Sequence, residues 1–516
     1  MEDLMQDYAE NGRKELGSPF TGAVLVAKDG NILFNKAYGL KDRNNLIPND
    51  VATKFPIGSL TKQFTAMLVV QMAEEGILEL EDPVSKHLEY LPKEFADVVT
   101  IHQLLSHTSG LPHYEGIINM GIDIDEFART KYSPKELAIL VSKVELNSEP
   151  GTNFHYSSLG YMLLGAILEK VSGESFAELL EIKITKPLGL NDTGFASNKF
   201  IKNETAKGYA FKEDKTFKMI FMKYGGDFHK VPFRDQSNTY TGGGMHSTVG
   251  DLLKWSEAVR SYTLLSPKFT EIMLKPNEQG YGYGWIRNWE DIMERNTKVK
   301  LYSHTGSTFG HASAITMFDD GTTIILTCNV NRIKVQKIVH QLYLLANGLK
   351  DIYGLEGYPD RGSLAEFEED GGVKAFNAYF EKLSELCGYE VKPSEGSLTH
   401  IMSLYYKNGI NKVGDSLKQA YFEMYKPNEG GVNQLGYRIL NINCEKAIEV
   451  FEENTRLHPE TPNTWDSLGD GYLECNNYVK AAECFSKAVV LAKSTNNPGL
   501  KYFQGNLQKV TLLLNE

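Results

Sequence analysis

The chain has 516 residues, a formal net charge of −12 at pH 7, 41% hydrophobic residues and 23% charged residues. This length is too great for one hydrophobic core, so we expect two or three domains. The acidic balance argues against binding to nucleic acid or to anionic lipid, and no apolar run is long enough to span a bilayer.

The N-terminal region predicts a β-hairpin followed by a helix. In TGAVLVAKDGNILFNKAYG, two β-rich runs flank Asp29 and Gly30, a pair typical of a tight hairpin turn. Over residues 61–77 the apolar residues recur at helical spacing, and Gly76 is placed to end that helix. A long stretch of mixed pattern follows, which we expect to contain many loops.

Strand patterns return near residue 300. KLYSHTGS predicts a strand that runs into a turn, and SAITMFDDGTTIILTCNV predicts a second hairpin that turns at Asp320 and Gly321. A helix over 334–348 would close the unit, and the aromatic run YGYGW at 281–285 predicts a packed strand. Strands from both ends of this region would pair into one antiparallel sheet, with the helical middle as a separate lobe.

Helical patterns dominate after residue 350. Pro, Gly and acidic residues predict a linker over 350–372, and a helical domain is expected over 373–516. EKAIEVF is repeated as VKAAECF, with Ala447 and Ala481 standing 34 residues apart. This period of paired helices resembles tetratricopeptide repeats. Helices near 374–385, 397–408 and 413–424 would then be degenerate earlier copies.

The tetratricopeptide resemblance implies an arm that binds a protein or peptide partner, and such helices would also offer a homodimer surface. The alternative is a plain helical cap packed on the first domain. Neither alternative follows from the residue pattern alone.

The cysteines and the first residues bear on the compartment. The segment MEDLMQDYAENGRKELG lacks the apolar core of a signal peptide, so we expect either a cytoplasmic protein or one whose export signal was removed. The five cysteines form no CxxC motif and no framework spacing, which favours a reducing compartment. They are Cys328, Cys387, Cys444, Cys475 and Cys484.

The stretch FPIGSLTKQF places Ser59 three residues before Lys62 at the start of the predicted helix. On a helix the two side chains share one face, so the lysine could remove the proton from the serine hydroxyl. A helix N-terminus would favour a neutral lysine and stabilise a developing oxyanion. The alternative is an N-cap serine beside a solvated lysine, which an isolated S-x-x-K would suggest.

Further motifs favour the catalytic interpretation. PGTNFHYSSLGYMLLGAILEKVSG places Tyr156 before an amphipathic helix, and YSHTGSTFGHAS places His304 at the end of a strand. TIHQLLSHTSGLP at 100–112 precedes them, and TGGGMHSTVGDLLKW at 241–255 lies between them. Over about residues 18–345, this order resembles the serine β-lactamase and penicillin-interacting superfamily. The nearest branches are the class C β-lactamases, D,D-peptidases, D-aminopeptidases and related esterases.

The resemblance implies roles for residues around the serine. Ser59 matches the acylated nucleophile, and Lys62 matches the base that activates it. Tyr156 matches the tyrosine that relays protons, and we expect the Lys62 cation to lower its pKa. The backbone N–H groups of Ser59 and Ser307 would form the oxyanion hole.

The resemblance also implies substrate-binding residues, with two departures from the family pattern. His304, Thr305 and Gly306 match the K-T-G strand that holds the carboxylate side of the substrate, but a neutral imidazole attracts a carboxylate less than lysine does. Ser158 stands where the Y-x-N motif has asparagine, which puts recognition of a substrate amide in doubt. Both departures favour a peptidase or an esterase over a β-lactamase.

Other motifs receive structural interpretations. We expect His107, His246 and His311 to be structural hydrogen-bonding histidines. The run of glycines at 242–244 lacks the Gly-Lys-Ser/Thr of a phosphate loop, so it predicts close backbone packing. Neither H-E-x-x-H nor a zinc cysteine set occurs, so neither a metal nor another cofactor is implied.

The sequence therefore predicts an α+β protein. Residues 1–349 would form a β-lactamase-like domain, an antiparallel sheet flanked by helices beside a helical lobe, and the tetratricopeptide-like domain would follow. The predicted activity is acylation of Ser59 by a small ester or peptide, then hydrolysis. The alternatives are β-lactamase activity, or a scaffold protein that binds a partner peptide through its repeats. Loops over 113–150 and 195–240 would shape the substrate pocket and carry no readable motif.

Overall fold

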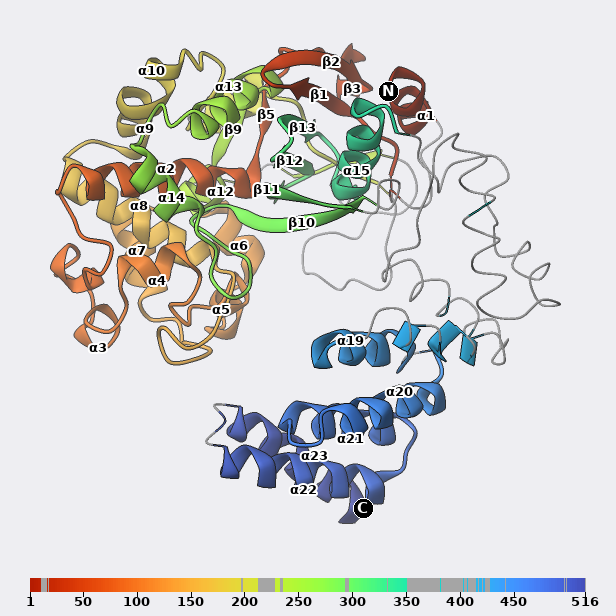
Figure 1. Cartoon of the computed structure of the whole chain (residues 1–516). Coiled ribbons are helices and arrows are strands. Elements are labelled where there is room, and N and C mark those ends of the chain that lie inside the picture. The colour runs from red at the N-terminus through yellow and green to blue at the C-terminus, as the bar shows by residue number, and fades with distance from the viewer. Residues whose placement is uncertain are drawn as a thin grey trace. The chain divides into compact units, whose positions relative to one another are not determined.

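The computed structural model of the chain (Figure 1) forms two compact units. The first consists of Met1–Glu290 with Lys298–Leu349, and the second of Asp291–Thr297 with Lys350–Glu516. The structure describes residues 1–10, 16, 18–195, 198–211, 228–232, 235–292, 297–331, 333–349, 381, 402, 406, 414–415, 417–419, 421–422, 427–440, 442–495, 497 and 499–515. The predicted linker over 350–372 lies outside these residues, as do most of the predicted helices near 374–385 and 397–408, and the predicted helix near 413–424 is described only in part.

The first unit is built on a six-stranded sheet in the order β10-β11-β12-β13-β1-β2. The strands are β1 (Gly22–Lys28), β2 (Asn31–Tyr38), β10 (Ile286–Ile292), β11 (Thr297–Thr308), β12 (His311–Phe318) and β13 (Thr322–Cys328). β1 pairs antiparallel with both β2 and β13, and β12 pairs antiparallel with β11 and β13. The prediction that strands from both ends of the region share one antiparallel sheet is confirmed.

Both predicted hairpin turns are confirmed. Asp29 and Gly30 join β1 to β2 with φ values of 49° and 75°, the left-handed conformation that a tight two-residue hairpin needs. Gly321, with φ of 89°, helps join β12 to β13. Local turn chemistry therefore fixes the register at both hairpins.

Helices cover both faces of the sheet, because alternate strand residues enter different cores. Leu25 and Ile315 belong to the large core that also holds Leu252 of α13 (Val249–Arg260). Phe318 instead packs against Tyr343 of α15 (Val335–Ala346), with ring centroids 4.1 Å apart. The helix predicted at the end of this unit is thus present and closes the second face.

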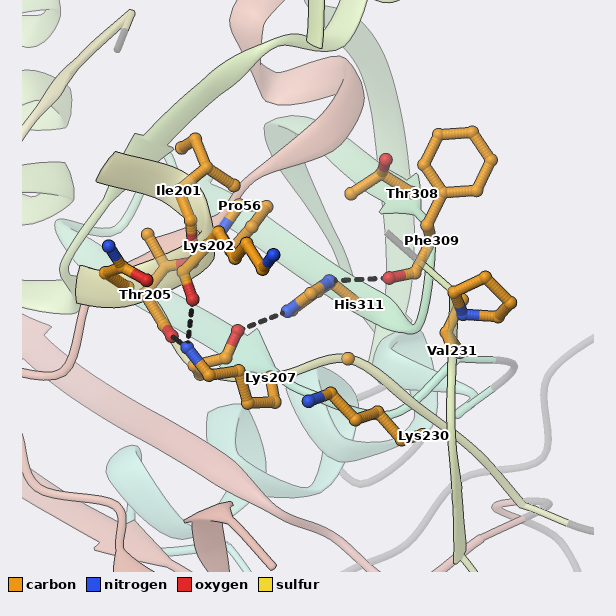
Figure 2. A pocket seen from close by; sticks show the side chains of 14 residues that line it. Pro56, Ile201, Lys202, Thr205, Lys207, Lys230, Val231, Thr308, Phe309 and His311 are labelled. Atoms are coloured by element: carbon orange, nitrogen blue, oxygen red, sulfur yellow. Dashed lines mark hydrogen bonds between the residues drawn. The ribbon is translucent and has the colours of Figure 1, made fainter. Parts of the chain in front are cut away.

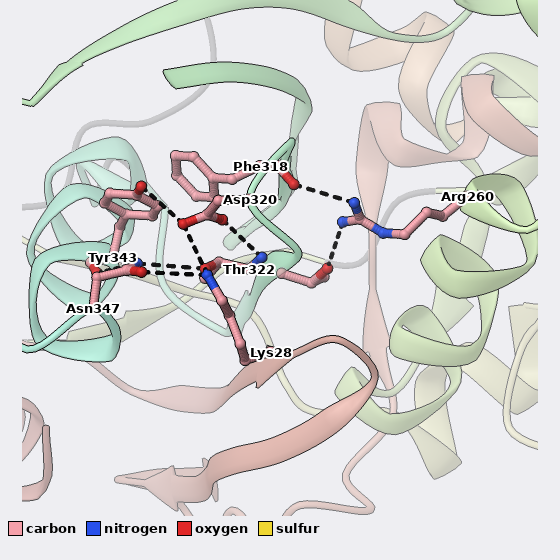
Figure 3. Close-up of polar contacts among 8 residues, drawn as sticks. Lys28, Arg260, Phe318, Asp320, Thr322, Tyr343 and Asn347 are labelled. Carbon is pink, nitrogen blue, oxygen red and sulfur yellow. Dashed lines mark hydrogen bonds and ion pairs between the residues drawn. The ribbon is translucent and has the colours of Figure 1, made fainter. Parts of the chain in front are cut away.

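Polar contacts fix both helices to the turn between β12 and β13 (Figure 3). Arg260 at the end of α13 donates to the Phe318 carbonyl at 3.1 Å. On the other side Tyr343 donates to Asp320 at 3.0 Å, and Asp320 also pairs with Lys28 at 2.9 Å. These contacts attach both helices to the end of the sheet at which β12 turns into β13.

The helical lobe surrounds α2 (Thr61–Glu74). Every residue from Thr61 to Met72 is buried, so the helix is enclosed on all sides rather than along one stripe. Gly76 adopts φ of 71° just beyond its end, as predicted. The main neighbours in this lobe are α4 (Ile101–Leu105), α7 (Pro134–Val141), α8 (Ser158–Ser172), α12 (Tyr240–Gly243) and α14 (Pro267–Leu274).

The described part of the second unit is helical. Its helices are α19 (Glu429–Leu440), α20 (Cys444–Leu457), α21 (Pro462–Glu474), α22 (Tyr478–Ser494) and α23 (Leu500–Asn515). Gly436 lies against the Phe451 ring, and Gly469 lies against the Phe485 ring in the same way. Two successive hairpins thus share one packing arrangement, while their assignment as tetratricopeptide repeats stays a prediction.

Two expectations about the chain as a whole can be compared with this fold. Cys444 and Cys475 form a disulfide, a bond that the cysteine spacing, interpreted as favouring a reducing compartment, did not predict. The bond joins the start of α20 to the residue after α21, a pairing that sequence spacing does not reveal. In the described ranges no helix has the length and apolar character needed to cross a membrane.

Candidate active site

Ser59 lies in a tight turn, η2 (Gly58–Leu60), that leads directly into α2. The turn is held from behind, because the Ile57 N–H donates to the Met245 carbonyl at 3.0 Å. Lys62 follows in the first turn of α2, and its Nζ lies 3.2 Å from Ser59 Oγ. Ser59 is partly exposed whereas Lys62 is fully buried, so solvent reaches the serine residue but not the lysine.

Lys62 is anchored by two further oxygens. Its Nζ donates to the Gly242 carbonyl at 2.6 Å and lies 3.0 Å from Ser158 Oγ. Burial lowers the pKa of Lys62 to about 7. A neutral amine keeps one lone pair, and the Gly242 carbonyl must receive one of its hydrogens. The lone pair is therefore available for the proton of Ser59.

Tyr156 lies in the loop immediately before α8, as predicted, and its hydroxyl hydrogen-bonds Ser59. Lys62 Nζ lies 4.9 Å from the centre of the Tyr156 ring. Burial raises the pKa of Tyr156, so the expectation that Lys62 would lower it is wrong. Desolvation of the phenolate outweighs the hydrogen bond to Ser59, which acts to lower the pKa. Tyr156 is thus a neutral phenol.

Backbone packing brings β11 against the serine turn. Gly58 has φ of 53°, and a Cβ there would lie 2.8 Å from the Ser307 nitrogen. Gly306 lies still closer to Ile57: a Cβ there would be 1.9 Å from the Ile57 carbonyl oxygen, which accepts a hydrogen bond from Ser313 at 2.8 Å. The backbone directly before Ser59 therefore packs on Ser307, and an oxyanion hole formed by the N–H groups of Ser59 and Ser307 stays a prediction. Ser307 is exposed and Thr305 partly exposed, whereas Gly306 is buried.

His304 is a neutral imidazole in this site. Its Nδ1 donates to the Thr305 carbonyl at 2.7 Å, so Nε2 accepts from the Tyr281 hydroxyl at 3.0 Å. The ring is 4% exposed, and burial lowers its pKa to about 3. Tyr281 comes from the aromatic run predicted as a strand. That prediction is wrong, because the run precedes β10 and only Tyr281 forms a bridge, to Ile286.

Several contacts at the site involve residues that belong to no recognised sequence motif. The Ser158 N–H donates to His113 Nδ1 at 3.3 Å, and the Ser158 hydroxyl hydrogen-bonds Tyr114. Ser158, predicted as a substrate-binding residue, thus lies buried between Lys62 and Tyr114. His113 and Tyr114 directly follow the HTSGLP motif, so the position of that motif could have identified them as site residues.

Of the three histidines expected to be structural, two form the expected hydrogen bonds. His107 is buried and accepts from the Ser157 N–H at 3.1 Å, and His311 contacts the carbonyls of Phe309 and Ala206. These two are structural, as expected. His246 packs beside Phe200, but its Nδ1 has no hydrogen-bond partner among the described residues.

Two glycines of the run at 242–244 are closely packed, as predicted: a Cβ at Gly242 would lie 2.9 Å from the Ser158 carbonyl and one at Gly244 would lie 2.6 Å from the Phe195 ring, whereas Gly243 has ordinary van der Waals space. In the part of the chain that the structure describes, no cluster of three or more His, Cys, Asp or Glu side chains is arranged to hold a metal ion.

Known proteins resemble this chain over the same region. The Beta-lactamase family model matches residues 12–346. The putative penicillin-binding protein PbpX of Bacillus subtilis is 29% identical over 344 residues, which cover 65% of this chain and 77% of that protein. Among solved structures, the octameric penicillin-binding protein homologue from Pyrococcus abyssi has 28% identity and a TM-score of 0.55, covering 68% of this chain and 78% of its own.

A D-amino acid amidase from Ochrobactrum anthropi shares the fold, with 22% identity, a TM-score of 0.56, and coverage of 67% of this chain and 99% of its own. The family match extends over more than half of the chain, and the same residues contain the serine, lysine and tyrosine that meet in the first unit. The chain therefore belongs to the beta-lactamase family, the superfamily of serine hydrolases that includes the penicillin-binding proteins.

Proposed function

We propose that this protein is a serine hydrolase that forms an acyl-enzyme on Ser59 with small esters or peptides. One observation carries the proposal: the buried Lys62 amine, with a pKa of about 7, lies 3.2 Å from Ser59 Oγ. A serine hydroxyl needs such a neighbouring base to act as a nucleophile near neutral pH.

Acylation begins when Ser59 Oγ attacks the substrate carbonyl carbon and its proton passes to Lys62 Nζ. The carbonyl π bond opens onto oxygen, and the N–H groups of Ser59 and Ser307 stabilise the oxyanion. When the intermediate collapses, the bond to the leaving group breaks. The proton on Lys62 is relayed through the neutral Tyr156 hydroxyl to the departing alcohol or amine.

Hydrolysis of the acyl-enzyme reverses these proton movements. Water attacks the acyl carbon and gives its proton to Lys62, and Ser59 Oγ leaves with that proton. The acid product departs with the water oxygen, and the free enzyme is restored. The same base therefore serves both half-reactions.

We propose esters and peptides in preference to β-lactams because His304 is neutral and engaged with Tyr281 and Thr305. The position where the family pattern has a lysine thus offers no positive charge to a substrate carboxylate. The penicillin-binding relatives keep β-lactam acylation as an alternative, with hydrolysis of the adduct slower than that of an ester.

The decisive test is intact-protein mass spectrometry after incubation with a fluorophosphonate, a penicillin, D-alanyl peptides and short-chain acyl esters. The wild type should gain the mass of a single adduct with the fluorophosphonate, and Ser59→Ala should gain none. The rate at which each further adduct disappears would rank the substrate classes. If none of the reagents gave an adduct, the proposal would be contradicted.

We further propose a catalytic domain over 1–349 and a helical domain over 373–516 that acts as a protein- or peptide-binding arm. Support comes from the matched packing of Phe451 and Phe485 in successive hairpins, since repeated hairpins build extended binding surfaces. A homodimer is part of this proposal, and light scattering of the full chain tests it. If Ser59 proves unreactive while the chain captures a peptide, the scaffold alternative takes its place.

A further inference from the structure

A pocket of about 620 Å³ lies at the end of β11 (Figure 2). Thr308 lines it and directly follows Ser307, so the Cα atoms of these two residues are ~3.8 Å apart. Pro56, three residues before Ser59, lines its other side. The pocket and the proposed acylation site therefore share the same two backbone segments.

The walls of the pocket are basic. Lys202 of α11 (Asn198–Glu204), Lys207 and Lys230 of β8 (Phe228–Lys230) line it, together with His311. None of the described residues that line it is acidic. A volume of this size would admit a charged group together with the atoms that carry it.

These lysines lack carboxylate partners. Within the described ranges none of the three forms an ion pair, and Lys207 Nζ donates only to the carbonyls of Lys202 and Thr205. Burial lowers the pKa of Lys207, and among the charges Asp42 raises it most, Lys230 and Lys202 lower it and Glu204 raises it. Ammonium groups that repel one another around a cavity are stabilised by an anion between them.

We propose that this pocket binds an anionic group of the substrate, a phosphate or a carboxylate, carried beyond the acyl bond that Ser59 attacks. The proposal rests on the hydrolase function proposed above and names the substrate class within it. It also explains how a site with a neutral His304 would recognise a charged substrate, because the positive charge lies in the neighbouring pocket instead.

The test compares three esters that share one acyl group and differ in the alcohol: an uncharged alcohol, the same alcohol with a terminal carboxylate, and the same alcohol with a terminal phosphate. The full-length wild type should hydrolyse at least one anionic ester with a kcat/KM about tenfold above that of the uncharged ester. Sodium chloride at 0.5 M should remove most of this preference by screening. The anionic ester with the larger gain in kcat/KM over the uncharged ester identifies the anion.

Two variants locate the effect. Lys202→Gln/Lys230→Gln should lower kcat/KM for the preferred anionic ester about tenfold and leave the uncharged ester unchanged. Lys199→Gln is the matched control, since Lys199 is an exposed lysine on the same helix that does not line the pocket. Equal loss in both variants, or no anionic preference in the wild type, would overturn the proposal.

A binding measurement separates this proposal from the hydrolase function. Calorimetric titration of the full chain with inorganic phosphate and with succinate should give saturable binding that the double variant weakens several-fold. If no ester is hydrolysed but this binding occurs, the hydrolase function fails and the anion site stands. If esters are hydrolysed but neither anion binds nor improves turnover, the anion site fails alone.

Discussion

The Lys62 ammonium loses its water when the side chain is buried between α2, α8 and α12, and no described carboxylate replaces that water. Its remaining partners are oxygens of Ser59, Ser158 and Gly242, which can each bond a neutral amine as well as a charged one. The charged form is therefore destabilised without compensation, and the lysine becomes a base at neutral pH.

The first prediction concerns this titration. Because only the neutral amine accepts the serine proton, kcat/KM for an uncharged ester should rise about tenfold per pH unit below pH ~7 and level off above it. Lys62→Arg cannot lose its proton near neutral pH and should lower kcat/KM by ~10²–10⁴. Initial rates from pH 5 to 10 test this. A profile without a step near neutrality would contradict the role of Lys62.

The second prediction concerns Tyr156, whose pKa is raised by burial. A neutral phenol can pass a proton to the leaving group, so Tyr156→Phe should lower the rate of acylation by ethyl esters by ~10²–10⁴. Nitrophenyl esters should be slowed much less, because nitrophenolate leaves without a proton. Stopped-flow acylation rates for both ester types provide the measurement.

The control for this variant is Tyr114→Phe, because Tyr114 hydrogen-bonds Ser158 rather than Ser59. Its rate loss should not depend on the leaving group. If Tyr156→Phe slowed both ester types equally, Tyr156 would be a positioning residue and not a proton relay.

At the scale of elements, α12 presents a backbone carbonyl to the site rather than a side chain. The Gly242 carbonyl reaches Lys62 because α12 packs directly on the start of α8, where a Cβ would lie 2.9 Å from the Ser158 carbonyl and 3.3 Å from the Ser158 Cβ. Both contacts are tighter than ordinary van der Waals separation. The absence of a side chain at this one position therefore sets the distance between two helices.

The third prediction follows from this contact. Gly242→Ala should push α12 away from α8, move the carbonyl from Lys62 and lower kcat about tenfold or more. Gly243→Ala is the matched control, since its Cβ would meet nothing closer than Thr239 at 3.7 Å. Ester turnover and thermal melting of both variants test the prediction. Equal activity in the two would show that the close approach has no catalytic consequence.

Local chemistry explains which elements the sequence predicts correctly. The turn at Asp29 and Gly30 and the end of α2 at Gly76 are decided by residues adjacent in the chain, and both were predictable. The strand expected at 281–285 fails because aromatic residues favour strands only in a suitable surrounding. Here Tyr281 packs against His304 instead.

The sequence predicts only those parts of the site that depend on the identity of a side chain. Ser59, Lys62 and Tyr156 follow from motifs, and the structure brings them together. A backbone carbonyl such as that of Gly242 has no motif. The pKa of Tyr156 depends on burial, which is a property of packing and not of the neighbouring sequence.

At the scale of the whole molecule, the two units have separate cores. One core cluster surrounds α2 and the sheet, and another consists of residues from Met402 to Val510. Each unit should therefore unfold with a transition of its own. The Cys444–Cys475 disulfide, which closes a separation of 31 residues, acts within the second unit only.

The last prediction uses this separation. A cross-link over a loop of this size restricts the unfolded chain and typically contributes ~3 kcal/mol. Cys444→Ser/Cys475→Ser should therefore lower the melting temperature of the helical unit by ~10–20 °C, while the first unit and ester hydrolysis by Ser59 stay unchanged. Calorimetry of the full chain measures both transitions, and a reducing agent should reproduce the effect in the wild type but not in the variant. Identical melting of wild type and variant would mean that the two thiols are unpaired, as in a reducing compartment.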